Sequence, residues 1–224
     1  MGTHEIPAAS PNRRSSPGLL VVAGAGLIGS RLADIAQDSG WKIRILHRSG
    51  PGRAPQKGLK VDASGREHTW WAPAEHLLAP EALEGARAVV CLSGAPIAPR
   101  PWTPARRRVL AASRLSTTAL IARVAAGLPP AVRPGVLLSG SATGFYGNRG
   151  DEILDETCGP GEGFLSELCQ RWEAAAGPAA RAGLRTIQSR TGLVVSPSGG
   201  LGKILSTAYR VGAGARLGRG DQWQ

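Results

Sequence analysis

The segment Leu19–Ala33, LLVVAGAGLIGSRLA, constrains the fold more than any other part of the sequence. Its first five residues form a short apolar run, which is typical of a buried parallel strand. Gly24, Gly26 and Gly29 follow with the spacing G-x-G-x-x-G, and the apolar residues after them recur at helical intervals. We therefore expect a strand, a tight glycine turn and a helix, in that order.

In this position the three glycines predict dinucleotide binding. Gly24 permits the tight turn, Gly26 lets a pyrophosphate approach the backbone, and Gly29 lets the helix pack closely on the strand. The N–H groups at the start of the helix, together with its dipole, favour a phosphate there. A turn with only a structural role stays open as the alternative. The residues predicted to bind a cofactor at this turn are Gly24, Gly26, Leu27, Ile28 and Gly29.

The next strand indicates which dinucleotide is bound. Residues 41–48, WKIRILHR, alternate and are rich in isoleucine, so they complete a βαβ unit with the preceding strand and helix. Sites that prefer NAD usually place Asp or Glu at the end of this strand, to bind the ribose 2′-hydroxyl. Here the strand ends in His47 and Arg48, and Arg48 can pair with a 2′-phosphate, which favours NADP (NADPH). A solvated loop arginine is the alternative interpretation of Arg48.

The remainder of the chain alternates between strands and helices and has no internal repeat. A long helix over 103–127 has Thr103 as its N-cap and Pro104 at its first position. This alternation predicts an α/β fold with a doubly wound parallel sheet. The other expected elements are strands over 66–73, 86–94, 135–142 and 184–196 and a second long helix over 164–183.

The excess positive charge lies in the first two thirds of the chain. The net charge is +11; residues 1–150 hold 19 Lys and Arg against 8 Asp and Glu, and residues 151–224 hold 8 of each. Such a charge can attract nucleic acid or a phosphorylated cofactor. The basic run at 106–108 has no interleaved aromatic residues, so nucleic-acid binding is the less favoured of the two.

Composition also bears on the compartment and on metals. The three cysteines lack C-x-x-C spacing and the four histidines include no His-Glu-x-x-His, so we expect neither a disulfide framework nor a metal site. No apolar run approaches the length of a membrane span. The twin arginine at 13–14 mimics an export signal, but the glycine spacing after it argues against one. We expect a soluble cytoplasmic protein whose polar residues 1–17 form a disordered tail.

Several segments together resemble one known family. They are VVAGAGLIGSRLA, VVCLSGAPI, RPWTPARRRVLAASRLSTTALI, LLSGSATGFYGNRGDEILDE, FLSELCQRWEAAA, RTGLVVSPSGGLGKIL and GAGARLGRGDQW, in this order along the chain. The sequence is similar to the epimerase-like branch of the short-chain dehydrogenase/reductase superfamily, and more narrowly to the group called epimerase family proteins. The resemblance implies a Rossmann-type NADP-binding domain over 18–198. It also implies that residues 199–224 begin a C-terminal substrate-binding part that is largely absent.

The resemblance assigns further residues to the cofactor. The equivalent positions are His47 and Arg48, then Leu92 and Ser93 after the fourth strand, and Arg114 on the long helix. Arg114 lies on the helix that follows the 91–102 segment, from which a cation can reach cofactor phosphate. An exposed helix arginine beside those at 106–108 is the alternative for Arg114.

For catalysis the resemblance implies Ser141 and Tyr146, with hydride transfer on an unidentified small carbonyl or sugar-like substrate. The superfamily's Tyr-x-x-x-Lys pair is absent, because alignment on the Trp-Glu pair of the 164–183 helix puts Leu165 and Cys169 at those positions. Tyr146 is the nearby phenol that can transfer a proton, and a packing tyrosine is the alternative. A catalytically silent nucleotide-binding or sensor protein is therefore the second functional hypothesis.

An acidic cluster follows Tyr146. It can contact a substrate or a cation, but a solvated loop is the favoured interpretation. Its members are Asp151, Glu152, Asp155 and Glu156.

Overall fold

The computed structural model describes residues 17–50, 52–97, 100–196 and 199–212. Its centre is a seven-stranded sheet in the order β3-β4-β2-β1-β5-β6-β7. Every neighbouring pair is parallel except β3 and β4. The strands are β1 (Leu19–Ala23), β2 (Lys42–Arg48), β3 (Lys60–Val61), β4 (Glu67–Trp71), β5 (Ala86–Cys91), β6 (Val136–Ala142) and β7 (Arg185–Thr191).

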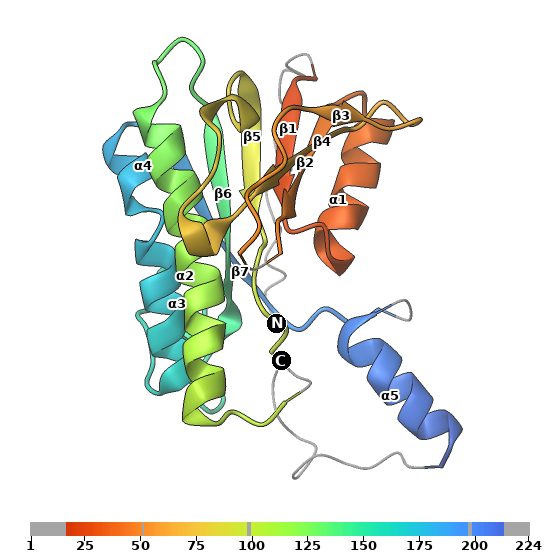
Figure 1. Ribbon diagram of the computed structural model, residues 1–224. Coiled ribbons are helices and arrows are strands. Elements are labelled where there is room, and N and C mark those ends of the chain that lie inside the picture. The colour runs from red at the N-terminus through yellow and green to blue at the C-terminus, as the bar shows by residue number, and fades with distance from the viewer. Residues whose placement is uncertain (1–16, 51, 98–99, 197–198, 213–224) are drawn as a thin grey trace, which may run out of the picture.

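Helices cover both faces of this sheet, as the doubly wound prediction requires (Figure 1). One face carries α1 (Leu27–Asp38), and the other carries α2 (Pro104–Gly127), α3 (Phe164–Ala174) and α4 (Gly177–Arg181). The last described helix, α5 (Gly200–Arg210), lies away from the sheet (Figure 1). Short 3-10 turns are formed by η1 (Pro73–Glu75), η2 (Pro80–Ala82) and η3 (Thr143–Tyr146).

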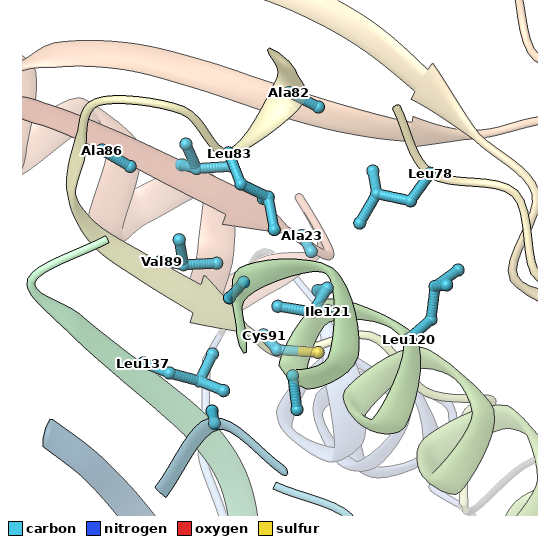
Figure 2. Packing of buried hydrophobic residues seen from close by; sticks show 14 of the residues in the cluster. Ala23, Leu78, Ala82, Leu83, Ala86, Val89, Cys91, Leu120, Ile121 and Leu137 are labelled. Carbon is cyan, nitrogen blue, oxygen red and sulfur yellow. The ribbon is translucent and has the colours of Figure 1, made fainter. Parts of the chain in front are cut away.

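The apolar core follows from alternation along the strands. In β1, Val21 and Ala23 face the α2 side, whereas Leu20 and Val22 face α1. On the α2 side, Ile121 is fully buried among sheet residues such as Val89, Cys91 and Leu137 (Figure 2). Both faces of β1 are therefore covered, which explains its continuous apolar sequence.

Helix α2 begins as the sequence predicts, because the Thr103 hydroxyl accepts a hydrogen bond from the Arg106 N–H at 3.2 Å and Pro104 occupies the first turn. By length and composition α2 is also apolar enough to cross a membrane. In this fold, however, apolar residues of α2 pack inside the protein: Leu110, Leu120 and Ile121 are buried against the sheet and the neighbouring helices. In this fold α2 is a core helix.

Four sequence predictions need correction. The single helix expected over 164–183 is two helices, because Pro178 has no N–H to continue the backbone ladder and its ring crowds the preceding turn. The strands expected over 86–94 and 184–196 end earlier, at Cys91 and Thr191. The strand before Leu92 is the fifth and not the fourth, because the two-residue β3 precedes β4.

The domain boundaries at 18 and 198 stay predictions, and residues 1–16 and 213–224 lie outside the described residues.

The sheet order creates a crevice where the chain changes direction. From β1 the chain passes to β2 on one side, and it later returns to β5 on the other. Ligands of open parallel sheets bind outside the carboxyl ends of the strands at such a switch point. The glycine turn follows β1 and lies at this point.

Candidate cofactor-binding site

The three glycines of the turn differ in what surrounds them. Gly24 has φ +105°, and a Cβ there would lie 2.7 Å from the Leu92 carbonyl carbon and the Ser93 nitrogen. A Cβ on Gly29 would overlap the carbonyl oxygen of Gly24. A Cβ on Gly26 would meet no atom of the described residues within 4 Å. The first and third glycines thus serve the turn and its packing, while the second faces open space where a ligand can approach.

The start of α1 is open to a ligand as well. Gly26 is its N-cap residue and offers no side chain to the first-turn N–H groups. The Ser30 hydroxyl does not cap them either, because it donates to the Ala25 carbonyl oxygen at 3.0 Å. Uncapped N–H groups at a helix N-terminus bind anions such as phosphate.

A cavity of about 540 Å³ lies over this turn. Its volume is within the range of small-molecule sites. It brings together the carboxyl ends of β1, β2 and β5, and nine of the predicted cofactor residues line it. Those nine are Gly24, Gly26, Leu27, Ile28, Gly29, His47, Arg48, Leu92 and Ser93; Ala25, Leu46, Trp71, Gly94 and Val194 complete the lining.

The end of β2 contributes two basic side chains of different character. Arg48 is exposed, and no described residue forms an ion pair with its guanidinium. His47 is half-buried, and its Nε2 lies 2.7 Å from Nδ1 of His68 on β4. His68 Nε2 in turn lies 2.9 Å from the Asp62 carboxylate. Sequence reasoning missed His68 and Asp62, because only the pairing of β2 with β4 brings them to His47.

The structure places the side chain of Arg114 outside the cavity lining. Its Nη1 donates to the carbonyl oxygens of Ala95 at 3.1 Å and Leu110 at 3.2 Å, and its guanidinium lies 5.2 Å from the ring centre of Trp172. Burial lowers the pKa of this guanidinium. The exposed-arginine alternative is therefore wrong: Arg114 holds the loop after β5, and a direct contact with cofactor stays a prediction.

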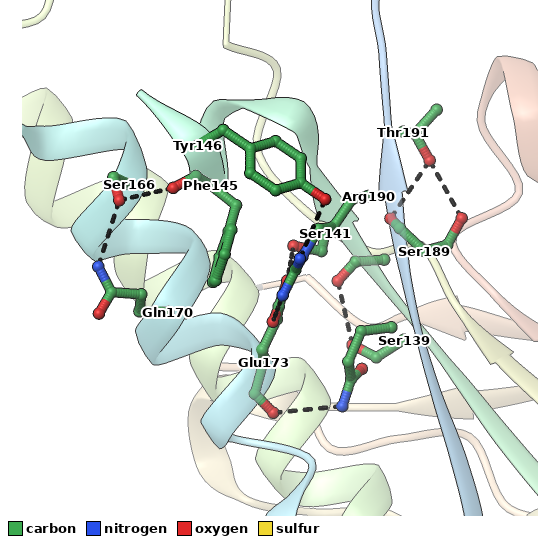
Figure 3. A network of polar contacts seen from close by, with 12 residues as sticks. Ser139, Ser141, Phe145, Tyr146, Ser166, Gln170, Glu173, Ser189, Arg190 and Thr191 are labelled. Carbon is green, nitrogen blue, oxygen red and sulfur yellow. Dashed lines mark hydrogen bonds and ion pairs between the residues drawn. The ribbon is translucent and has the colours of Figure 1, made fainter. Parts of the chain in front are cut away.

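Ser141 and Tyr146 belong to one polar network (Figure 3). The Ser141 hydroxyl donates to Oε1 of Glu173 on α3 at 2.6 Å. Arg190 of β7 donates to both Glu173 oxygens, at 2.9 and 3.0 Å, and to the Tyr146 hydroxyl at 3.1 Å. Ser141 is 5% exposed and Tyr146 is 7% exposed. The two predicted catalytic hydroxyls are thus linked through an ion pair.

Sequence reasoning missed the roles of Glu173 and Arg190 in this network. From the sequence alone, Glu173 marks only an alignment position and Arg190 is one residue of the strand expected over 184–196. A signal was present, because an arginine within a half-buried strand requires a partner. The strand register explains why Arg190 meets this network, because Arg190 of β7 is paired with Ser141 of β6.

The positions of the missing Tyr-x-x-x-Lys pair are apolar or buried. The Leu165 side chain packs against Gly144, where an added Cβ would lie 3.3 Å from Leu165 Cβ. Cys169 is buried, and burial raises the pKa of its thiol. Neither residue supplies the phenol or the cation of the usual pair.

A second cavity of about 640 Å³ adjoins Tyr146. Two of the four acids of the cluster line it and the other two do not. Asp155 and Glu156 line it, together with Thr143 and Arg190. Asp155 also holds its own turn, because it accepts hydrogen bonds from the Thr157 N–H and hydroxyl, which lower the pKa of its carboxyl.

The other two acids of the cluster do not line this cavity. Glu152 pairs with Arg149 at 2.7 Å on the surface. Among the described residues no cluster of three or more His, Cys, Asp or Glu is arranged to hold a metal ion.

Comparison with known proteins shows which sequences and structures this chain resembles. No family profile matches the chain. An epimerase family protein of Mycobacterium bovis is 35% identical over 206 residues, which are 92% of this chain and 63% of that relative. Over the length that it spans, this chain is similar to an epimerase family protein, and it spans less than two thirds of that relative. A chloroplastic epimerase family protein of Arabidopsis thaliana is 30% identical over 226 residues. The chain spans 62% of that relative's length.

Solved structures share the fold of this chain. A nucleoside-diphosphate sugar epimerase from Corynebacterium glutamicum matches with TM-score 0.73 and 31% identity, over 93% of this chain and 40% of that one. The human epimerase family protein, crystallised with NADPH, matches with TM-score 0.72 and 25% identity, over 91% of this chain and 63% of that one. The Rossmann-type architecture predicted from the sequence is therefore confirmed.

Proposed function

We propose that the cavity over the glycine turn binds NADP(H), and that this chain is the cofactor-binding part of an oxidoreductase or epimerase-like protein. One observation carries the proposal: an open Gly26 and an uncapped helix start lie in the same cavity as the end of β2. The turn would hold the pyrophosphate and β2 would hold the adenosine ribose. The NADPH in the human relative's crystal structure supports the same cofactor class.

Preference for the 2′-phosphate rests on Arg48. No acidic residue follows β2 to accept a hydrogen bond from a ribose hydroxyl, and the Arg48 guanidinium forms no ion pair with a described residue. A guanidinium binds phosphate oxygens with two parallel hydrogen bonds, which favours NADP over NAD.

A thermal-unfolding titration with NADPH, NADH and NADP+ tests this proposal. A ligand at 100 times its dissociation constant adds about 2.7 kcal/mol to the free energy of unfolding. We expect a clear stabilisation by NADPH that shrinks in Arg48→Ala. Arg108→Ala on the exposed face of α2 is the matched control and leaves the stabilisation unchanged. A folded chain that no dinucleotide stabilises would leave the glycine turn with only a structural role.

Turnover is the finer part of the proposal. Bound NADPH would supply a hydride to a small carbonyl or sugar-like substrate. The Tyr146 phenol is the group that would exchange a proton with the substrate oxygen, and Arg190 orients it through the 3.1 Å hydrogen bond. The Ser141 hydroxyl donates its one proton to Glu173, so toward a substrate it would act as an acceptor for a hydroxyl group.

A second candidate, a catalytically silent nucleotide-binding protein, is favoured by one specific observation. The alignment that the resemblance implies puts Leu165 and Cys169 where the superfamily has its Tyr and Lys, and Cys169 is buried. Ser141→Ala and Tyr146→Phe separate the two candidates. A fall in turnover in either variant, with NADPH affinity retained, supports the enzyme. Turnover unchanged in both, or absent from the parent chain, supports the silent protein.

A further inference from the structure

Asp62, His68 and His47 form a continuous chain of hydrogen bonds that ends at the cavity. One Asp62 oxygen accepts from the N–H and hydroxyl of Ser64, at 2.8 and 2.7 Å, and from the Arg66 N–H at 3.1 Å. The other lies 2.9 Å from His68 Nε2, and His68 Nδ1 lies 2.7 Å from His47 Nε2. The carboxylate is thus fixed by its own turn, and the two imidazoles extend from it toward the cavity that His47 lines.

The direction of each hydrogen bond follows from the carboxylate. Hydrogen bonds from Ser64 and then from His68 hold the pKa of the Asp62 carboxyl well below its usual range, so it only accepts. His68 must therefore carry its proton on Nε2, and the neutral ring accepts at Nδ1. His47 then donates from Nε2, which leaves a lone pair on its own Nδ1.

Few other charges lie around the pair. Burial, and secondarily the neighbouring His68, lower the pKa of His47 below its ordinary value. The rings of His47 and Trp70 lie 5.5 Å apart, and Lys60 Nζ of β3 lies 5.2 Å from the Trp70 ring centre.

The remaining charges near the pair come from α1 and from β2 itself. On α1, Asp34 is neutralised by Arg66 at 2.7 Å. Arg48 follows His47 in the strand and lines the same cavity, so it is a second cation beside any phosphate that His47 contacts. Asp62 is therefore the anion that reaches the imidazoles directly.

We propose that His47 discriminates between a 2′-phosphate and a 2′-hydroxyl on the bound dinucleotide through its protonation state, with His68 and Asp62 as positioning residues. The inference rests on the proposed NADP(H) site. Neutral His47 offers an acceptor, which suits a ribose hydroxyl. Protonated His47 is a donor at both nitrogens and carries a charge, which suits a phosphate dianion. Asp62 and His68 hold the His47 ring in place through the hydrogen-bonded chain.

A pH dependence of cofactor choice follows. A 2′-phosphate beside the pair raises its affinity for a proton, so the NADPH complex binds more protons than the free chain. Affinity for NADPH must then fall as pH rises, whereas affinity for NADH, which lacks the phosphate, changes little. Above about pH 6.5 the phosphate is mostly a dianion, so its own titration contributes little. We expect the ratio of NADPH affinity to NADH affinity to fall about three- to tenfold between about pH 6.5 and 8.5.

Calorimetric titration of the full chain with NADPH and with NADH, in two buffers of different ionisation enthalpy, measures affinity and proton uptake together. The variants are His47→Gln, His68→Gln and Asp62→Asn. Asp62→Asn keeps an oxygen for the Ser64 and Arg66 N–H groups, removes the charge, and replaces the acceptor that faces His68 Nε2 by an amide donor. His76→Asn, an exposed histidine outside the cavity lining with φ 56°, is the matched control, because Asn tolerates that backbone.

The expected result is proton uptake with NADPH that all three variants reduce and His76→Asn retains. NADH affinity should stay unchanged in His68→Gln, Asp62→Asn and His76→Asn, which alter residues outside the cavity lining. Cooperative thermal unfolding shows that each variant, His47→Gln included, is folded. NADPH binding whose pH dependence survives in His47→Gln overturns the inference and leaves the proposed function intact. Absence of binding by either dinucleotide at every pH, in a chain that unfolds cooperatively, overturns both.

Discussion

Arg190 binds both carboxylate oxygens of Glu173: its Nε donates to Oε1 at 2.9 Å and its Nη2 donates to Oε2 at 3.0 Å. The same guanidinium lies 3.5 Å from the ring centre of Phe145. This pair joins β7 to α3 and positions the hydroxyls of Ser141 and Tyr146, so it ties the stability of the fold to the geometry of the candidate catalytic site.

Glu173→Ala leaves the Arg190 cation without its carboxylate in a largely buried position. We expect the free energy of unfolding to fall by about 2–4 kcal/mol, measured by urea denaturation. Glu173→Gln, which keeps one acceptor oxygen, should lose about half as much. Glu167→Ala removes an exposed carboxylate from the same helix and should cost less than about 1 kcal/mol. Equal losses in Glu173→Ala and Glu167→Ala would contradict the role assigned to the pair.

The same pair predicts a pH dependence of stability. Burial alone would raise the pKa of the Glu173 carboxyl, but hydrogen bonds from Arg190 and Ser141 outweigh it, so the pKa lies below its ordinary 4.5. The stabilisation is therefore fully present above about pH 4.5 and is lost as pH falls through the lower value of the folded chain. Urea denaturation of parent and Glu173→Gln, compared from about pH 7 to pH 3, should show the difference between them shrinking on acidification. A difference in free energy of unfolding that grows as the pH falls would contradict the lowered pKa of the Glu173 carboxyl.

Features governed by local sequence were predictable. The glycine spacing after a five-residue apolar run located β1, the turn and α1, because both the turn and the packing need glycine at fixed positions. Thr103 followed by Pro104 located the start of α2 for a similar reason. The break before α4 was also visible in the sequence, since Pro178 stands in the middle of the predicted helix.

Contacts set by strand register were not predictable. The two residues of β3 carry no periodic pattern and form a strand only by pairing with β4. His47 and His68 are 21 residues apart, and only the parallel pairing of β2 with β4 makes them neighbours. Arg190 reaches Ser141 and Glu173 in the same way, through the pairing of β6 with β7. One sequence without an alignment shows which residues have chemistry, and the sheet order shows which of them meet.

The three cysteines should differ in reactivity. Cys91 and Cys169 are buried, and burial raises the pKa of each thiol, so little thiolate is exposed to reagent. Cys158 is half-buried in the loop before α3, with its Sγ 3.5 Å from the Asp155 carboxylate. A disulfide reagent at about neutral pH should label one thiol quickly, and Cys158→Ser should remove that phase. Three equally fast thiols in the folded chain would show that α3 does not protect Cys169.

The glycine turn offers the sharpest separation of folding from binding. Gly26→Ala adds a methyl group where no described atom lies within 4 Å, so the free energy of unfolding should change by less than about 1 kcal/mol. The same methyl group occupies the space that a pyrophosphate needs, and NADPH stabilisation should be lost. Gly29→Ala forces its methyl group onto the Gly24 carbonyl oxygen and should destabilise the chain by about 2 kcal/mol or more. Parallel unfolding curves with and without NADPH distinguish the two effects. If Gly26→Ala kept full NADPH stabilisation, the dinucleotide would have to bind away from this turn, and the proposed site would be wrong.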